Sequence, residues 1–194
     1  ALRHSREKRP LAERDTYGRA FLQVANLWRV DEGVARFVLA RRFARAAATL
    51  LGVPAVRLYH DQALFKEAGG GHTPWHQDQF YWPLEDGRTI TLWMPLADVP
   101  PEVGSMTFAS GSHLLGDLGS KHISDASDAH YAALIAERGL PLETHGALRA
   151  GDATFHAGWT LHSAPANPTE AMRPVMTVIY FADGLRVAEP RHVA

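Results

Sequence analysis

His76 and Asp78 are the two residues of this 194-residue chain whose types and spacing best suit chemistry. On an extended strand, residues two apart project from the same face, so an imidazole and a carboxylate at these positions can converge on one metal ion. The spacing is weak support by itself, because histidine and aspartate are frequent enough here for one such pair to arise by chance. A metal site therefore needs a further ligand from elsewhere in the chain.

A second cluster of candidate ligands lies in the segment 151–167, which contains His156 and His162 and is followed by Arg173. Either histidine would complete a set of two imidazoles and one carboxylate. Such a set leaves adjacent coordination positions open and is typical of non-haem Fe(II) oxygenases. The chain has no cysteine, so any metal must be bound by nitrogen and oxygen atoms.

The composition argues against several other classes of function. Lys and Arg number 20, Asp and Glu 21, and the formal net charge is -1, so no net field attracts nucleic acid or an anionic membrane surface. No apolar run approaches the roughly 20 residues of a membrane helix, and no signal sequence is evident. We expect a soluble, cytoplasmic protein acting on a neutral or small molecule, with neither nucleic acid nor membrane as a partner. Because position 1 is Ala, we also expect the natural chain to begin earlier.

The elements that must position these residues begin with helices. Apolar residues share one face of the segment Asp31 to Leu51 and arginines share the opposite face, which predicts one amphipathic helix. Asp31 can cap its start, and Gly52 followed by Pro54 ends it. The apolar spacing also predicts a shorter helix from about Tyr17 to Trp28.

Short extended segments dominate the rest of the chain. The predicted strands are Val56 to Phe65, Thr89 to Leu96, Ser105 to Ala109, Asp152 to His156 and Val175 to Ala182. One helix is expected at about Asp128 to Arg138, ended by Gly139. Several strands in succession indicate a mainly β sandwich or jelly roll with flanking α-helices. With no internal repeat and no long linker, we expect a single domain over residues 1–194.

Four short motifs together resemble the phytanoyl-CoA dioxygenase family of Fe(II)- and 2-oxoglutarate-dependent oxygenases. They are Trp75-His76-Gln77-Asp78, Gly104-Ser105-Met106, Gly111-Ser112-His113, and the segment His162 to Asn167 followed by Arg173. The resemblance extends from about Tyr59 to Phe181. It implies a double-stranded β-helix, the jelly roll shared with cupins, over about 55–185. Helices at about 17–51 would precede it within one oxygenase domain.

The resemblance also implies roles for individual residues. His76, Asp78 and His162 would bind Fe(II). His162 fits the family's distal position better than His156, because its local setting and its spacing from Arg173 match. Arg173 would bind the far carboxylate of 2-oxoglutarate, for which a planar, permanently charged guanidinium suits better than an ammonium group. The other nearby histidines are expected to pack, to support the site or to lie at the surface: His72, His113 and His156.

Further residues are expected around the metal and the cosubstrate. Family members line the cosubstrate pocket from three regions, which correspond here to Gln62, Thr73 and Trp93. Many members have a hydroxyl residue two positions after the distal histidine, where this chain has Ala164, and that departure removes one expected hydrogen bond to the cosubstrate.

Aromatic residues and loops are candidates for contact with the organic substrate. Phe80, Tyr81 and Trp82 follow the ligand pair and are expected to pack in the core or to border the substrate. The glycine-rich segment Gly69 to Gly71 is expected to be a flexible loop that leads into the strand of His76 and forms part of a lid. The loops Gly69 to Thr73 and Gly116 to Asp128 are expected to shape the substrate entrance.

The reaction that the resemblance implies uses Fe(II), 2-oxoglutarate and O2 to oxidise a C–H bond of a small organic substrate. Hydroxylation, epimerisation, desaturation and cyclisation are its known outcomes in the family. Because many relatives modify secondary metabolites such as antibiotics, we expect a substrate of that kind. Asp78 argues against halogenation, since related halogenases have a small residue there. Two alternatives stay open: a cupin-like metal enzyme that does not use 2-oxoglutarate, and an inactive binding barrel.

Overall fold

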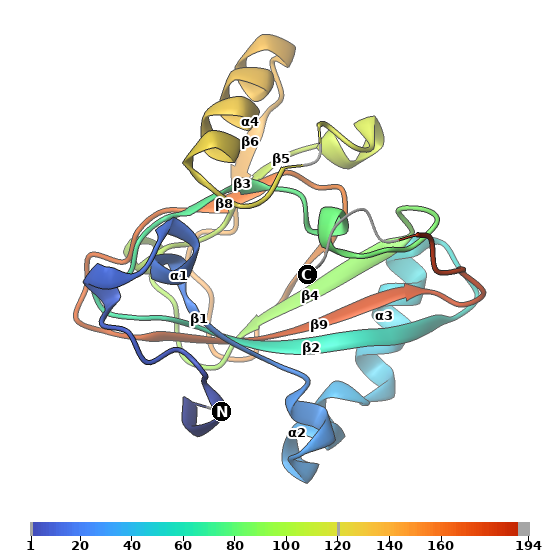
Figure 1. The fold of residues 1–194 in the computed structure, drawn as a ribbon. Coiled ribbons are helices and arrows are strands. Elements are labelled where there is room, and N and C mark those ends of the chain that lie inside the picture. Colours follow the sequence, from blue (N-terminus) through green and yellow to red (C-terminus); the bar gives the residue numbers. More distant parts are fainter. Residues whose placement is uncertain (1, 120, 190–194) are drawn as a thin grey trace.

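The protein contains two antiparallel β-sheets that face each other (Figure 1). Residues of both sheets line a cavity between them. The computed structural model describes residues 2–119 and 121–189. The strands of the larger sheet, in spatial order, are β1 (Leu22–Ala25), β2 (Val56–Lys66), β9 (Arg173–Ala182), β4 (Thr89–Pro95) and β7 (Thr154–Ala157). Those of the smaller sheet are β3 (Thr73–His76), β8 (His162–Ala164), β5 (Thr107–Ala109) and β6 (Leu142–Thr144).

The helices α2 (Glu32–Val38), α3 (Arg41–Leu51) and α4 (Asp125–Arg138) pack on the outer faces of the sheets (Figure 1). The short helix α1 (Thr16–Ala20) instead carries Tyr17, which lines the cavity. α2 and α3 cover the larger sheet, and α4 lies against the smaller one. Short 3-10 helices lie at Leu2–His4, Leu11–Glu13, Leu27–Arg29, Asp78–Tyr81, Pro101–Val103 and Ser112–Leu115. Within the described residues, no helix has both the length and the apolar character needed to cross a membrane.

Alternation along the strands of the larger sheet separates core residues from cavity residues. On β4, Ile90, Leu92 and Met94 belong to the core beneath α2 and α3, whereas Thr91 and Trp93 line the cavity on the opposite face. The predicted alternation of this strand is therefore confirmed. The same strand thus supplies both the packing that stabilises the sheet and the side chains of the site.

A β-bulge in β2 directs two consecutive side chains into the cavity. Leu58 pairs with Tyr180 and His60 pairs with Ile179, so Tyr59 is the extra residue. Leu58 packs against the core, but Tyr59 and His60 both line the cavity. Bulges commonly re-aim side chains beside functional sites in this way.

The segment predicted as one helix from Asp31 to Leu51 is instead two helices, α2 and α3. The chain is extended at Ala40, between them. Val38 and Phe43 both lie in the core on the sheet, although residues five apart on one continuous helix point about 140° away from each other. The break changes the helical phase so that both can be buried. The predicted ends are confirmed, since the Asp31 side chain caps α2 and Gly52 ends α3 in the left-handed conformation.

The helix predicted from Tyr17 to Trp28 is wrong beyond its first turn. α1 ends at Ala20, and the next residues form β1, which pairs with β2. This pairing satisfies the backbone groups of both strands. It also places Val24 in the core and Gln23 in the cavity. Sheet pairing therefore overrides the helical spacing of the apolar residues.

The other predicted elements lie close to the observed ones. The five predicted strands correspond to β2, β4, β5, β7 and β9, with ends shifted by one or two residues. The predicted helix at Asp128 begins earlier, at Asp125, because Ser124 caps it, and Gly139 ends it as predicted. The sequence does not predict the short strands β1, β6 and β8.

Asp61 on β2 anchors the N-terminal segment to the larger sheet. Its buried carboxylate accepts hydrogen bonds from the backbone N–H groups of Leu27 (3.1 Å) and Trp28 (3.2 Å). We expect Asp61→Ala to lower the free energy of unfolding by about 2–3 kcal/mol, because both donors lose a charged partner. Urea denaturation followed by circular dichroism measures this change.

Asp86→Ala is the matched control, since Asp86 pairs with Arg88 near the surface (2.8 Å). It should lower the free energy of unfolding by no more than about 1 kcal/mol. Equal losses in the two variants would contradict an anchoring role for Asp61.

Candidate functional site

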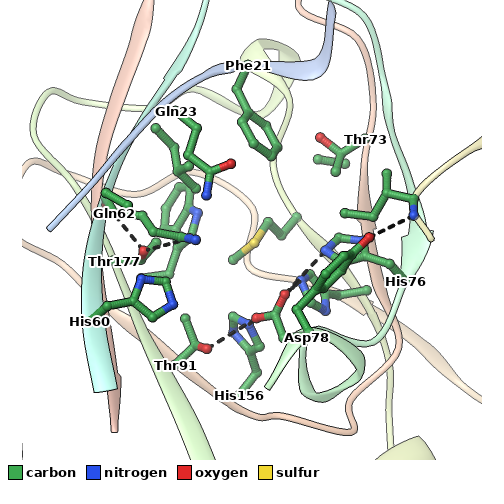
Figure 2. A pocket seen from close by; sticks show the side chains of 18 of the residues that line it. Phe21, Gln23, His60, Gln62, Thr73, His76, Asp78, Thr91, His156 and Thr177 are labelled. Carbon is green, nitrogen blue, oxygen red and sulfur yellow. Dashed lines mark hydrogen bonds and ion pairs between the residues drawn. The ribbon is translucent and has the colours of Figure 1, made fainter. Parts of the chain in front are cut away.

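The cavity between the sheets has a volume of about 530 Å³ and is lined by residues of both (Figure 2). Inward-facing side chains come from β2, β4, β7 and β9 of the larger sheet and from β3 and β8 of the smaller one. The N-terminal segment closes another side. In Figure 2, Phe21 and Gln23 point into the cavity from this segment, while Asp78, Thr91 and His156 gather opposite them.

His76, Asp78 and His162 bring three potential metal ligands together at this cavity. One ligand atom of each lies within 4.8 Å of the other two. Nε2 of His76 lies 3.5 Å from Oδ1 of Asp78, and Nε2 of His162 lies 3.8 Å from the same oxygen. His76 pairs with His162 across β3 and β8, so sheet pairing brings the two imidazoles side by side.

The predicted arrangement of His76 and Asp78 on one strand is wrong in detail. β3 ends at His76, and Asp78 begins a 3-10 helix. The two side chains still converge because Gln77 between them is extended. Alternation therefore continues for one residue beyond the strand.

Backbone carbonyls fix the orientation of both imidazoles. Nδ1 of His76 lies 2.7 Å from the carbonyl oxygen of Pro74, and Nδ1 of His162 lies 2.9 Å from that of Thr160. A ring nitrogen facing a carbonyl must carry the proton, which leaves Nε2 with a free lone pair. In both rings the unprotonated nitrogen is thus the one that faces Asp78.

Two further residues hold the Asp78 carboxylate from the other side. Oδ2 of Asp78 lies 3.2 Å from Oγ1 of Thr91 and 3.3 Å from Nε2 of His156. Oδ1 is left facing His76 and His162. This geometry favours His162 over His156 as the second imidazole ligand and gives His156 a supporting position.

Charges around the site favour the protonation states that metal ligands require. Burial raises the pKa of Asp78, but His162, His156 and His76 together outweigh it and hold that pKa well below its ordinary value. Burial, with the proximity of His76, lowers the pKa of His162 well below its ordinary value. An ionised carboxylate at Asp78 and a neutral imidazole at His162 are the forms that bind a divalent cation.

Removing the support of Asp78 should weaken metal binding without abolishing it. We expect Thr91→Val and His156→Ala each to reduce Fe(II) affinity by roughly 10- to 100-fold, the usual effect of losing an outer hydrogen-bond partner of a ligand. Competition with a chromogenic chelator measures the affinity. Thr154→Val is a matched control, because the buried Thr154 hydroxyl on β7 has no hydrogen-bond partner among the described residues. If Thr91→Val behaved like this control, the supporting role of Thr91 would be refuted.

Arg173 lies at another end of the cavity, at the start of β9, with 3% of its surface exposed. Its Nη1 donates to the carbonyl of Gly104, and its guanidinium lies over the Trp93 ring, 5.2 Å from the centroid. Nε has no hydrogen-bond partner within the described residues, and no described carboxylate forms an ion pair with Arg173. Burial lowers the pKa of Arg173 to about 10, so the group stays cationic at neutral pH. A buried cation with an unused donor is suited to binding an anion.

The remaining predicted residues fall into two groups. Gln62, Thr73, Trp93, Tyr81 and Trp82 all line the cavity. Phe80 does not, and neither do His72 and His113. The Phe80 ring instead contacts the rings of Tyr81 and His122, with centroids 4.9 Å and 4.8 Å away. At the position that departs from the family pattern, Ser163 and Ala164 both line the cavity.

Each of the two predicted entrance loops contributes a residue to the cavity: Thr73 from Gly69 to Thr73, and Ile123 from Gly116 to Asp128. Ile123, from the loop between Gly116 and Asp128, lines it and donates its backbone N–H to the hydroxyl of Tyr81 (2.9 Å). Ser120 in the same loop lies outside the described residues.

The prediction that Gly69–Gly71 forms part of a lid is wrong. These residues do not line the cavity. Gly71 donates its backbone N–H to Arg19 (2.8 Å), and the carbonyl of Gly70 accepts from Asn167 (2.8 Å). Backbone hydrogen bonds thus connect this loop to Arg19 and to Asn167.

Some cavity residues escape prediction from the sequence. Thr91 has a usable signal, because it lies two residues before Trp93 on an alternating strand. Tyr59 and His60 depend on the bulge. Gln23 depends on β1, which only sheet pairing reveals.

Comparison with known proteins gives a matching family model and two related hydroxylases. The family model described as "Phytanoyl-CoA dioxygenase (PhyH)" matches residues 1–175. The methylphosphonate hydroxylase of Gimesia maris is 26% identical over 152 residues, which are 77% of this chain and 54% of the relative. The L-proline trans-4-hydroxylase of Streptomyces griseoviridis is 28% identical over 196 residues, covering 91% of this chain and 73% of the relative.

A solved structure extends the comparison to the fold. The crystal structure of SnoN, a non-haem alpha ketoglutarate dependent epimerase from nogalamycin biosynthesis, has a TM-score of 0.77 and 33% sequence identity. The match covers 90% of this chain and 67% of that one. SnoN is also known in complex with Fe3+, alpha ketoglutarate and nogalamycin RO. This chain spans about half the length of the methylphosphonate hydroxylase, at 54%. With its family model matching 1–175, the chain belongs to the phytanoyl-CoA dioxygenase family.

Proposed function

We propose that this chain is an Fe(II)- and 2-oxoglutarate-dependent oxygenase domain that oxidises a C–H bond of a small organic substrate. The observation that carries the proposal is one cavity lined both by a two-histidine, one-carboxylate set and by a buried arginine that forms no ion pair within the described residues. We also propose that the two sheets are the halves of a double-stranded β-helix, and that residues 1–194 form a single domain.

The donor set fits Fe(II). Two imidazoles and one carboxylate on one side of an ion leave adjacent positions open for other ligands. His76 and His162 present unprotonated Nε2 atoms, and Asp78 presents Oδ1 while its other oxygen is hydrogen-bonded. When bound, Fe(II) with 2-oxoglutarate and O2 supplies the oxidant for a C–H bond, while the 2-oxo acid becomes succinate and CO2.

The far end of the cavity fits the second carboxylate of 2-oxoglutarate. The Nε of Arg173 has no hydrogen-bond partner among the described residues and can donate to a ligand. The Trp93 ring, over which the guanidinium lies, restricts the position of the guanidinium. Gln62 and Thr73 line the same cavity as Arg173 and the proposed metal ligands. These residues would orient the cosubstrate and exclude water from it.

The rest of the cavity is suited to a substrate with an apolar or aromatic body. Tyr17, Phe21, Tyr81 and Trp82 line it beside the polar groups of Gln23. SnoN acts in nogalamycin biosynthesis, and the curated relatives are hydroxylases of small molecules. We therefore propose a small organic substrate, of the secondary-metabolite kind, for this chain as well.

The test is the conversion of 2-oxoglutarate itself. Incubated with Fe(II), O2 and 2-oxoglutarate, the protein should form succinate and CO2 in equal amounts, slowly without substrate and faster with one. Removal of Fe(II) or of O2 should stop both products. A metal enzyme that does not use 2-oxoglutarate, or an inactive barrel, would form no succinate, and that result would overturn the proposal.

A further inference from the structure

Lys66 is a buried lysine directly opposite Arg173. It ends β2 and pairs with Arg173, which begins β9. Residues opposed on antiparallel strands project from the same face of the sheet, so the two cationic side chains are neighbours. Lys66 is 0% exposed and Arg173 is 3% exposed.

This pair of cations has no carboxylate partner in the part of the chain that the structure describes. None of the ion pairs there includes Lys66 or Arg173. Glu67, the acidic residue that follows Lys66 directly, is paired with Arg14 instead. Like charges placed opposite each other destabilise a sheet, and buried charges are costly unless an opposite charge accompanies them. Binding of an anion from outside the chain would offset both costs.

Lys66 also contacts the backbone that orients Arg173. The carbonyl of Gly104 accepts from Nη1 of Arg173. The Lys66 stem packs against the same glycine, where an added Cβ would lie 3.1 Å from Cδ and 3.3 Å from Cε of Lys66. At its end, Nζ donates to the carbonyl of Gly71. Lys66 does not line the cavity, so it can act only through Arg173 and through its charge.

We propose that Lys66 is a positioning residue for the far carboxylate of 2-oxoglutarate: it braces the Gly104 carbonyl that orients Arg173 and adds a second positive charge behind it. This inference rests on the proposed function. It predicts that removing the charge weakens the binding of a dicarboxylate but not that of a 2-oxo acid with one carboxylate.

The protonation of Lys66 is consistent with this role. Burial, and then the charge of Arg173, lowers the pKa of Lys66 to about 7. An anion bound to Arg173 would favour the charged form of Lys66. The charge is therefore held weakly without the ligand and more firmly with it.

The experiment compares two acids that differ only in the far carboxylate. 2-Oxoglutarate and 2-oxopentanoate are titrated into Fe(II)-loaded protein without O2, and Kd is measured by calorimetry. In Lys66→Met, which keeps the length of the stem, Kd for 2-oxoglutarate should rise about tenfold or more, as expected for losing a charge near the ligand. Kd for 2-oxopentanoate should change less than about threefold. Lys8→Met, the same change at an exposed lysine, should alter neither Kd.

A second variant and a second measurement distinguish a role of Lys66 in positioning the ligand from a role in the stability of the fold alone. Lys66→Arg keeps the charge and should retain the preference for 2-oxoglutarate. The ligand-free Lys66→Met protein should unfold at no lower temperature than wild type, because it no longer buries an unpaired cation. If Lys66 were needed only for the fold, Lys66→Met would lower the unfolding temperature and would weaken the binding of both acids equally. That result would overturn the inference.

The outcomes for wild type distinguish this inference from the proposed function. If wild type binds neither acid, the proposed function fails. If wild type prefers 2-oxoglutarate and Lys66→Met keeps that preference in full, only the role of Lys66 fails.

Discussion

Asp78→Ala is expected to abolish tight Fe(II) binding and, with it, the conversion of 2-oxoglutarate to succinate. Asp78 is the only carboxylate in the set with His76 and His162. Its removal leaves two imidazoles, which have no negative charge to offset that of a divalent cation. The loss in affinity should exceed the roughly 10- to 100-fold that follows from removing an outer partner of a ligand. Chelator competition measures the affinity, and succinate formation measures the conversion.

Asp86→Ala is the control for this change as well, because Asp86 lies on the same loop and pairs with Arg88. It should leave both Fe(II) affinity and succinate formation unchanged. A protein with Asp78→Ala that still bound Fe(II) as tightly as wild type would show that the metal is held elsewhere.

Arg173→Met is expected to have the second largest effect, on the cosubstrate rather than on the metal. Truncating one partner of a buried, hydrogen-bonded charge pair costs about 2–5 kcal/mol, so Kd for 2-oxoglutarate should rise roughly 30-fold to several thousand-fold. Fe(II) affinity should stay the same, because Arg173 is not among the three clustered metal-ligating residues. Calorimetry without O2 measures both constants.

Arg57→Met is a matched control for Arg173, since Arg57 lies near the start of β2 in an exposed pair with Asp183. It should leave Kd for 2-oxoglutarate unchanged. Equal effects of the two variants would mean that Arg173 acts only through net charge, and the assigned carboxylate subsite would be wrong.

The clustering of His76, Asp78 and His162 could be predicted because these residues lie in short motifs with a fixed order. His76 and Asp78 are separated by one residue, and the extended Gln77 keeps both on one side. The choice of His162 over His156 required context, because both histidines line the same cavity. What separates them is the register of two sheets: His162 pairs with His76, while His156 pairs with Thr91.

The supporting roles of Thr91 and Lys66 could not be predicted, because they depend on contacts across the sheets, although the alternation of β4 does predict that Thr91 shares a face with Trp93. Thr91 looks like an ordinary strand residue until β4 and β7 place it beside Asp78. Lys66 looks like a solvated strand end until its register opposite Arg173 is known. Neither position belongs to a motif.

The same limit applies to the fold. Long alternating strands such as β4 and β9 were predictable from local pattern, and so were the caps at Asp31 and Gly52. The break at Ala40 and the strand β1 could not be predicted from local pattern. The break depends on how α2 and α3 pack on the larger sheet, and β1 depends on its pairing with β2. Helical spacing of apolar residues cannot reveal which partner the chain will find.

The most direct test of the central claim is a visible spectrum of the protein with Fe(II) and 2-oxoglutarate in the absence of O2. Chelation of Fe(II) by the keto and carboxylate oxygens of the acid gives a charge-transfer band in the visible range. The wild-type protein should show this band, Asp78→Ala should not, and Arg173→Met should show it only at much higher 2-oxoglutarate concentrations. If wild type binds Fe(II) but develops no band with 2-oxoglutarate, the account of this cavity as a joint iron and 2-oxoglutarate site is wrong.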